Sequence, residues 1–352
     1  MDPLVSAEFA PDMTYLNTST CGLLPRRAVA AVQEMAGANA TGRGGLGDGG
    51  FEIVNAARAS FARLAGVPAD RVAVGGSVAV HIAVIAAPLR PGAEVLLPEG
   101  EFSSVSTPFA MRGDLRTRHV PLDRLAEEVR PETALVAFSA VQSADGRIAD
   151  LAGVRAAAAA HGARTLLDAS QSAGWLPLAA GAYDYTVTAG YKYLCSPRGT
   201  SFLTVTEEAQ ESLVPLHAGW VAGEDPWAST YGPVGELARS ARRYDESPAL
   251  LAYCGAERSL ALLEEIGVER IHAHDTALAA RFRKGLAALG HVPVDAGDSA
   301  VVALPGLAHR HPGLRQARVA VAVRAGSLRT AFHLYNTTED VDRALEALGP
   351  AA

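Results

Sequence analysis

The chain has 352 residues, 49% of them hydrophobic, and a formal net charge of −7. This length is enough for one large domain or for a large and a smaller one, and the composition is typical of a globular α/β protein. Nucleic acid is excluded as an expected partner because no run of lysines or arginines could follow a phosphate backbone. A membrane-spanning helix is excluded as well, because no apolar stretch reaches the roughly 18–20 residues that it needs.

Apolar strands alternate with amphipathic helices between about residue 50 and residue 205. The predicted strands cover residues 71–74, 94–98, 117–121, 134–139, 164–168, 184–189 and 200–205. The predicted helices cover residues 50–64, 78–87, 122–129 and 151–161, and a further helical pattern covers residues 26–35. This alternation predicts a mostly parallel sheet between two layers of helices.

The remainder of the chain has a different order of elements. Residues 214–247 are rich in Gly, Pro and Trp and are predicted to form a long loop, followed by a helical block over residues 248–289. Grouped strands at 300–304, 318–323 and 328–332 then precede a final helix at 338–348. We therefore expect a large domain, residues 15–247, and a smaller α+β domain, residues 248–352 together with residues 1–14.

One acid and one amine stand at the ends of two predicted strands. Asp168 ends the apolar strand RTLLD, and Lys192 follows the next strand. This pair suits pyridoxal phosphate (PLP), whose aldehyde forms a Schiff base with a lysine and whose protonated ring nitrogen pairs with a carboxylate. The only other lysine, Lys284, lies in a segment that is predicted to form an exposed helix. Lys192 is therefore the better candidate for the Schiff base.

The segment VAVGGSVAVHIAV predicts a strand, a Gly-Gly-Ser turn and a helix. Free N–H groups at the start of such a helix can hold a phosphate, although Ser77 could equally serve only as the helix N-cap. The spacing of Gly42, Gly44 and Gly47 matches the dinucleotide-binding motif G-x-G-x-x-G. They follow a helical pattern rather than a strand, so we interpret them as a loop and not as a dinucleotide site.

Two alternatives come from other classes of protein. Ser77, Asp168 and His333 occur in the Ser…Asp…His order of α/β-hydrolases, and Gly75-Gly76-Ser77-Val78-Ala79 approximates a nucleophile elbow. The second glycine of that elbow is missing, however, and a hydrolase would leave the context of Lys192 unexplained. A degenerate PLP fold that acts only as a binding module is the other alternative.

These residues, in this order, resemble the class V aminotransferase family of fold-type I PLP-dependent enzymes, which includes cysteine desulfurases, C–S lyases, kynureninase and isopenicillin N epimerase-like proteins. The resemblance runs from Tyr15-Leu16-Asn17-Thr18 to the C-terminal helix. It is strongest in the closing segment RAGSLRTAFHLYNTTEDVD, residues 324–342. It implies a fold-type I architecture, in which a large domain with a mostly parallel sheet between helices is joined to a smaller α+β domain.

The resemblance implies a role for each matching residue at the cofactor ring and phosphate. Lys192 would form the Schiff base, Asp168 would bind the ring nitrogen, and Gln171 would bond the phenolic oxygen. Phe102 would stack on the ring, where many relatives have histidine. The phosphate would be held by Ser77 and Val78.

Further implied roles concern the substrate and a second subunit. Gln142 falls where relatives place an asparagine beside the substrate, and Arg329 is the expected clamp for the substrate's α-carboxylate, a task that suits a guanidinium. Gly219-Trp220 resembles a kynureninase loop that reaches a neighbouring subunit's cofactor. Trp220 is therefore expected at the cofactor, and a homodimer is implied.

Three departures from the family pattern narrow the expected reaction. Ala189 and Tyr191 stand where many relatives have serine and histidine, so Thr188 or another residue would have to replace the phosphate-binding serine. No cysteine occurs in residues 303–319, where desulfurases carry their nucleophile. We therefore expect β-elimination from an S-substituted cysteine or its sulfoxide, with transamination or epimerisation of an amino acid as alternatives.

The cellular location is expected from the cysteines and the N-terminus. Cys21, Cys195 and Cys254 are odd in number, widely separated and without metal-ligand spacing, which is typical of reduced thiols. The N-terminus has no basic segment followed by an apolar core. We expect a cytoplasmic enzyme without a bound metal.

Overall fold

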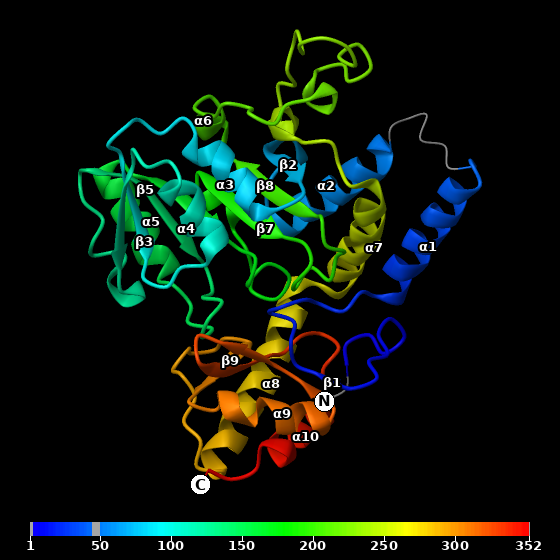
Figure 1. Cartoon of the computed structure of the whole chain (residues 1–352), viewed down its shortest axis with the longest axis vertical. Coiled ribbons are helices and arrows are strands. Elements are labelled where there is room, and N and C mark those ends of the chain that lie inside the picture. The colour runs from blue at the N-terminus through cyan, green and yellow to red at the C-terminus, as the bar shows by residue number, and fades with distance from the viewer. Residues whose placement is uncertain (1–2, 44–49, 352) are drawn as a thin grey trace.

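The computed structural model describes residues 3–43 and 50–351 of the chain, and its central feature is a seven-stranded sheet (Figure 1). The strands are β2 (Val72–Gly75), β3 (Glu94–Pro98), β4 (Arg116–Val120), β5 (Thr133–Ser139), β6 (Arg164–Asp168), β7 (Tyr185–Ala189) and β8 (Ser201–Val205). They lie in the order β2-β8-β7-β6-β5-β3-β4. β8 runs antiparallel to both β2 and β7, and all other neighbouring strands are parallel, which confirms the predicted, mostly parallel sheet.

Helices cover both faces of this sheet. On one face, α3 (Val78–Ala86) and α4 (Ser103–Ala110) pack their apolar side chains against alternate strand residues such as Leu166 and Val187. On the other face lie α2 (Phe51–Ala65) and α5 (Leu151–His161), against residues such as Phe202 and Leu167. Apart from the edge strand β4, which is polar and partly exposed, the strands are buried on both faces, which explains the apolar residues along them.

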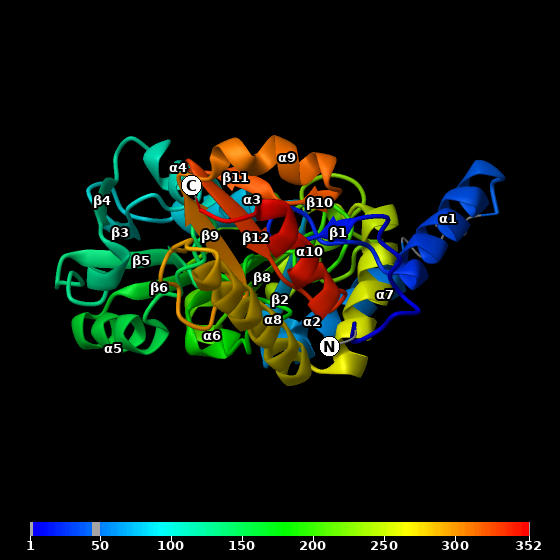
Figure 2. The same ribbon diagram turned by 90° about the horizontal axis from the view of Figure 1, so that it is seen from below.

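A smaller unit lies at one end of the molecule (Figures 1 and 2). Its antiparallel sheet has the order β11-β12-β9, formed by β11 (Ala322–Arg324), β12 (Ser327–Ala331) and β9 (Val301–Pro305). Around it lie α8 (Val268–Ala288), α9 (His311–Gln316) and α10 (Thr338–Leu348). The N-terminal β1 (Thr14–Tyr15) pairs with β10 (Val319–Ala320), so both ends of the chain belong to this unit.

The helices α1 (Arg26–Ala40) and α7 (Leu250–Ile266) flank the large sheet, and α7 packs against α1 and α2. A short helix, α6 (Glu207–Gln210), follows β8. The domain boundary at residue 247 stays a prediction, although the packing of α7 favours a boundary nearer Gly267, where α8 begins. Within the described residues no helix is long and apolar enough to cross a membrane.

Two local expectations were wrong, and each has a physical reason. The helix predicted at residues 122–129 is only a turn of 3-10 helix, Leu122–Arg124, followed by further turns. Leu122, Leu125 and Val129 are buried at helical spacing, but so short a segment cannot offset the cost of helix nucleation.

The helix α4 was not predicted because it contains Pro108 and four serine or threonine residues. Burial of Val105 and Phe109 stabilises it nevertheless. Gly44 and Gly47 of the glycine-rich patch lie outside the described residues.

Candidate active site

The predicted site residues meet at one edge of the large sheet. Asp168 ends β6, Lys192 lies in the segment after β7, and Ser77 lies between β2 and α3. Gln142 and Phe102 follow β5 and β3. These five positions share the carboxyl edge of the parallel strands, which is where ligands bind in open α/β sheets.

Lys192 is almost completely buried, with 5% of its surface exposed. Burial, and to a lesser extent the charges of Arg329, Arg198 and Arg324, lower the pKa of its amine to about 8 against the opposing effect of Asp168. Its Nζ lies 5.1 Å from the centre of the Phe102 ring. The amine can therefore lose its proton near neutral pH, as a nucleophile or base requires.

The backbone around Lys192 is held by a local turn and by the N-terminal segment. Gly22 donates its N–H to the Tyr191 carbonyl at 2.8 Å, and Cys195 donates to the Lys192 carbonyl at 3.1 Å. A Cβ at Gly22 would lie 2.0 Å from the Lys192 carbonyl oxygen, so only glycine permits this approach. The N-terminal segment thereby fixes the position of the lysine.

Asp168 and Gln171 lie on the floor of the site. Asp168 accepts a hydrogen bond from the Ser170 N–H at 2.8 Å, and burial raises the pKa of its carboxyl, opposed by the charge of Lys192. Gln171 donates through Nε2 to the Ser19 carbonyl at 3.0 Å and to Ser143 Oγ at 3.1 Å. Its buried Oε1 has no partner within the described chain, so one polar atom remains for a bound group.

Arg329, on β12, closes the site from the smaller unit. Its Nη1 donates to the carbonyl of Ser143 and, at 3.1 Å, to Ser143 Oγ, while its Nη2 donates to Thr20 Oγ1 at 2.9 Å. The Nε–H is buried without a partner, and no carboxylate of the described residues pairs with this guanidinium. Burial lowers its pKa to about 10, so the site holds a desolvated cation that lacks an anion.

Glu101, which the sequence reasoning missed, lies beside Phe102. Its buried carboxylate accepts hydrogen bonds from Ser139 N at 2.8 Å, Ser139 Oγ at 2.6 Å, Phe102 N at 2.6 Å and Gln142 Nε2 at 3.2 Å. Burial raises the pKa of this carboxyl. It ties the start of α4 to the end of β5 and so positions both Phe102 and Gln142. The available signal was an acid three residues after an apolar strand, in PEGEF.

The turn before α3 has the properties of an anion site. Ser77 is the N-cap of α3, but its side chain makes no capping hydrogen bond, and Val78 is the first helical residue. The neighbouring Gly76 N–H is occupied by the Glu246 carboxylate. The hydroxyl of Ser77 and the first N–H groups of α3 could hold a phosphate, although the carboxylate of Glu246 occupies part of the same turn.

Thr188 does not replace the missing serine at Ala189. Successive side chains of a strand point to opposite faces of the sheet, and Ala189 shares the α3 face with Val187. Thr188 therefore points to the other face, where its Oγ1 is buried without a partner in the described structure. On the α3 face, Ser201 lies opposite Ala189 and pairs with His81 Nε2 at 3.0 Å.

The arrangement of His333 contradicts the hydrolase alternative. Its Nδ1 pairs with Asp275 at 2.9 Å, not with Asp168, and its Nε2 bonds the Tyr193 carbonyl at 2.9 Å. Both ring nitrogens are engaged in a fully buried network, so His333 cannot activate Ser77. A Ser77–His333–Asp168 triad does not exist in this fold.

The ring contacts of Trp220 within the described residues are with aromatic side chains that are not predicted site residues. Trp220 belongs to an aromatic cluster with Phe51, at 5.5 Å between ring centres, and Trp227, at 5.2 Å. Trp220 and Trp227 belong to the segment between α6 and α7, which projects as a long loop at the top of Figure 1. A role for Trp220 at a cofactor stays a prediction that requires a second copy of the chain.

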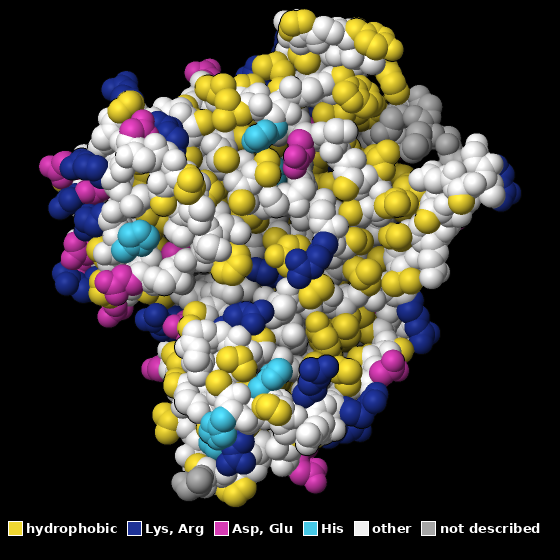
Figure 3. Space-filling view, in the orientation of Figure 1, with side chains coloured by type: hydrophobic (Ala, Val, Ile, Leu, Met, Phe, Trp, Pro, Cys, Tyr) yellow, Lys and Arg dark blue, Asp and Glu magenta, His cyan; other side chains and the backbone are white. Residues whose placement is uncertain are grey.

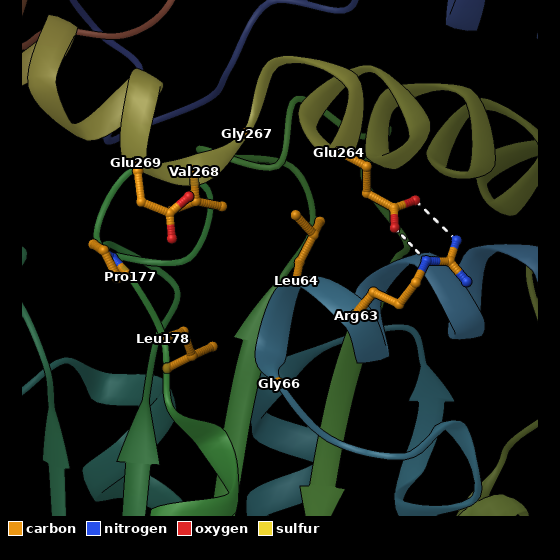
Figure 4. Close-up of a pocket in the computed structure, with 9 residues that line it drawn as sticks. All are labelled: Arg63, Leu64, Gly66, Pro177, Leu178, Glu264, Gly267, Val268 and Glu269. Atoms are coloured by element: carbon orange, nitrogen blue, oxygen red, sulfur yellow. Dashed lines mark hydrogen bonds and ion pairs between the residues drawn. The ribbon is translucent and has the colours of Figure 1, made fainter.

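A pocket of about 360 Å³ lies elsewhere, between the end of α2 and the junction of α7 with α8 (Figure 4). Its wall includes Leu178 and Glu269, and an ion pair of Arg63 with Glu264 (Nη2–Oε2, 2.9 Å) bounds one side. None of the predicted site residues lines this pocket. It is therefore not the site described above.

Comparison with known proteins gives one consistent result. The family model described as Aminotransferase class-V matches residues 14–344. An uncharacterized aminotransferase, YcbU, of Bacillus subtilis is 27% identical over 321 residues, which cover 85% of this chain and 84% of that protein. The kynureninase of Deinococcus radiodurans is 27% identical over 306 residues, 80% of this chain and 74% of that enzyme.

A solved structure supports the fold. The cystine C–S lyase C-DES, in complex with its product cysteine persulfide, superimposes with a TM-score of 0.86 and 23% identity. The match covers 96% of this chain and 98% of that chain. The two-unit architecture described above is therefore that of fold-type I PLP-dependent enzymes.

Proposed function

The chain belongs to the aminotransferase class-V family of PLP-dependent enzymes, and from this we propose that it is a C–S lyase that eliminates the β-substituent of an S-substituted cysteine or its sulfoxide. The observation that carries an amino-acid substrate is the combination of Lys192, with its lowered pKa, and the unpaired buried guanidinium of Arg329. An amino acid needs both a base for its Cα proton and a cation for its carboxylate.

The residues fit the cofactor. Asp168 would hold the ring nitrogen, and Phe102 would lie against the ring. The buried Oε1 of Gln171, which has no partner in the described structure, would form a hydrogen bond with a polar group of the ring. The phosphate would be held by Ser77 and the first N–H groups of α3, beginning at Val78. When bound, PLP supplies an aldehyde for the lysine and an electron sink for the carbon–hydrogen bond that breaks.

The protein's own groups supply the remaining steps. Arg329 binds the α-carboxylate through its Nε–H and a hydrogen of Nη2, which project from the same edge of the guanidinium. Gln142, fixed by Glu101, borders the substrate. Lys192 removes the proton from Cα, and the Cβ–S bond breaks as its electron pair leaves with sulfur. With one water consumed, a thioether substrate yields pyruvate, ammonia and a thiol, and a sulfoxide yields a sulfenic acid in place of the thiol.

The absence of a cysteine in residues 303–319 supports elimination over persulfide-forming desulfuration. The likeness to a cystine C–S lyase supports the fold on which such chemistry occurs. Transamination and epimerisation use the same lysine and arginine, and they are the outcomes that the following experiment distinguishes.

The test is incubation of the purified protein with cystine, an S-alkylcysteine sulfoxide or alanine. We expect pyruvate from the first two without any amino acceptor, and none from alanine. Lys192→Ala should abolish pyruvate release and the borohydride-sensitive visible absorption band, whereas the matched change Lys284→Ala should preserve both. Pyruvate from alanine only when a keto acid is added would indicate transamination. Racemised substrate would indicate epimerisation.

We also propose a homodimer, in which the loop that carries Trp220 contacts a second copy. Trp227, which packs on Trp220, is 53% exposed, and Tyr231 on the same loop is 92% exposed. Exposed aromatic side chains of this kind are enriched at protein interfaces. Size-exclusion chromatography with light scattering should give twice the chain mass, and Trp220→Ala with Trp227→Ala should shift the protein toward monomer.

A further inference from the structure

A second arginine lies next to Arg329. Arg324 is the last residue of β11 and pairs across the hairpin with Ser327, while Arg329 pairs with Ala322. Side chains alternate along a strand, so Arg324 and Arg329 are on the same face of the hairpin, as diagonal neighbours about 7–8 Å apart. Their guanidiniums meet at one hydroxyl: Arg324 Nη2 donates to Thr20 Oγ1 at 3.3 Å and Arg329 Nη2 donates to it at 2.9 Å.

The hairpin turn holds Arg324 in this position. Ala325 and Gly326 are its two central residues, with φ of 46° and 76°. Positive φ at both centres is the signature of the tight turn that matches the twist of paired strands. Alanine is rarely found in this conformation, and such local strain occurs preferentially at functional sites.

The three arginines near Lys192 have no acidic partner among the described residues. Neither Arg324, Arg329 nor Arg198 forms an ion pair within the described residues, although the whole chain carries a net charge of −7. Arg198 stacks on the Tyr191 ring, 4.2 Å from its centre, and Tyr191 lies beside Lys192. Basic side chains flank the hollow between the two units in Figure 3, and acidic side chains lie farther out.

A single α-carboxylate neutralises only one of these cations. Arg329 is the buried member and has the unpartnered Nε–H, so the α-carboxylate belongs there. Arg324 is exposed, at the mouth of the site, and its guanidinium remains for a group farther along the substrate. Two cations at this spacing are complementary to a short dianionic ligand.

Resting on the function proposed above, we infer that the substrate carries a second carboxylate at the end of its side chain, and that Arg324 binds it while Arg329 binds the α-carboxylate. S-carboxymethylcysteine is the simplest compound of this class. Arg324 is thus a specificity-determining residue for an acidic S-substituent.

Two unreactive acids test the recognition directly. Glutarate and butyrate have the same carbon chain except that glutarate carries a second carboxylate. Calorimetry on the cofactor-loaded protein should give a dissociation constant about tenfold lower for glutarate, a preference that weakens as salt is raised. Arg324→Ala should remove the preference and leave butyrate within about twofold, Arg324→Lys should retain part of it, and the remote control Arg116→Ala should retain all of it.

Two reactive compounds extend the test to turnover. The kcat/KM for S-carboxymethylcysteine should be higher than that for S-ethylcysteine, because its KM should be lower. Arg324→Ala should remove this difference between the two compounds. Equal binding of glutarate and butyrate by the unchanged protein would overturn the inference. So would equal weakening of both acids in Arg324→Ala, since Arg324 would then serve only the α-carboxylate. Preference for glutarate without pyruvate from either cysteine derivative would instead refute the lyase and leave the second anion site standing.

Discussion

Replacing Lys192 by methionine should stabilise the cofactor-free protein, and the gain should depend on pH. The amine has a pKa of 10.5 when unperturbed and about 8 in the fold, chiefly because it is buried. Below pH 8 the lysine is charged in both the folded and the unfolded chain, so the folded state bears the full cost of burying the charge. This cost shrinks as pH rises from 8 to 10.5. With about 1.4 kcal/mol per decade of proton affinity, it is roughly 3 kcal/mol at pH 7 and about 2 kcal/mol at pH 9.

The assay is urea unfolding of Lys192→Met at both pH values. Removing the amine leaves Asp168 buried without its counter-charge, so the comparison is made in an Asp168→Asn background. Because the charge of Asp168 raises the pKa of Lys192, its removal lowers that pKa further, and the gain from Lys192→Met in this background should be at least as large as the values above. Lys284 provides the matched control, because it is exposed and the only other lysine. Lys284→Met should change the free energy of unfolding by less than about 0.5 kcal/mol at either pH.

The reasoning would be refuted by a Lys192→Met change that destabilises the protein in this background. A gain that is the same at pH 7 and pH 9 would also refute it, because a buried ammonium must lose its cost as it loses its proton. The expected result would show that the lysine is retained for chemistry at the expense of stability.

Three further changes follow from the contacts described. Arg329→Lys should raise KM for the amino acid by at least about tenfold, because one ammonium cannot replace a two-point guanidinium contact; an unchanged KM in steady-state assays would remove Arg329 from the carboxylate site. Asp168→Asn should lower kcat about a hundredfold while the visible cofactor band persists, because a neutral amide does not keep the ring nitrogen protonated; full turnover in this variant would contradict that role. Asp275→Ala should lower the free energy of unfolding by about 3–5 kcal/mol in urea, because the buried His333 loses its carboxylate partner; a loss below about 1 kcal/mol would show that the pair contributes little.

The large sheet was predictable because all of its strands except the edge strand β4 are buried on both faces. The middle of such a strand must be apolar on both faces, as Leu166 and Leu167 are in Arg164–Asp168, and the predicted bounds of this strand agree with the structure. Asp168 interrupts that apolar run, so its chemistry is visible without a structure. The same holds for Lys192, one of two lysines in the chain. Short segments stabilised mainly by their neighbours, such as α4 with its internal Pro108, were not predictable in this way.

Residues that act through contacts with distant segments were beyond sequence reasoning. Glu101 is ordinary by type, and only the fold buries it against Ser139 and Gln142. His333 had a plausible place in a triad by order along the chain, yet the fold pairs it with Asp275. Order along the chain carries no information about which buried acid a histidine will meet.

The amino-acid sequence alone therefore determined the class of fold and the identity of the acid and the amine, because burial and alternation are written into local patterns. Only the tertiary structure decided which cations share the site. Arg324 and Arg329 are separated by a turn in the sequence, and hairpin register, together with Thr20 from the other end of the chain, brings their guanidiniums to one hydroxyl. Such convergence depends on long-range packing, which no local pattern records.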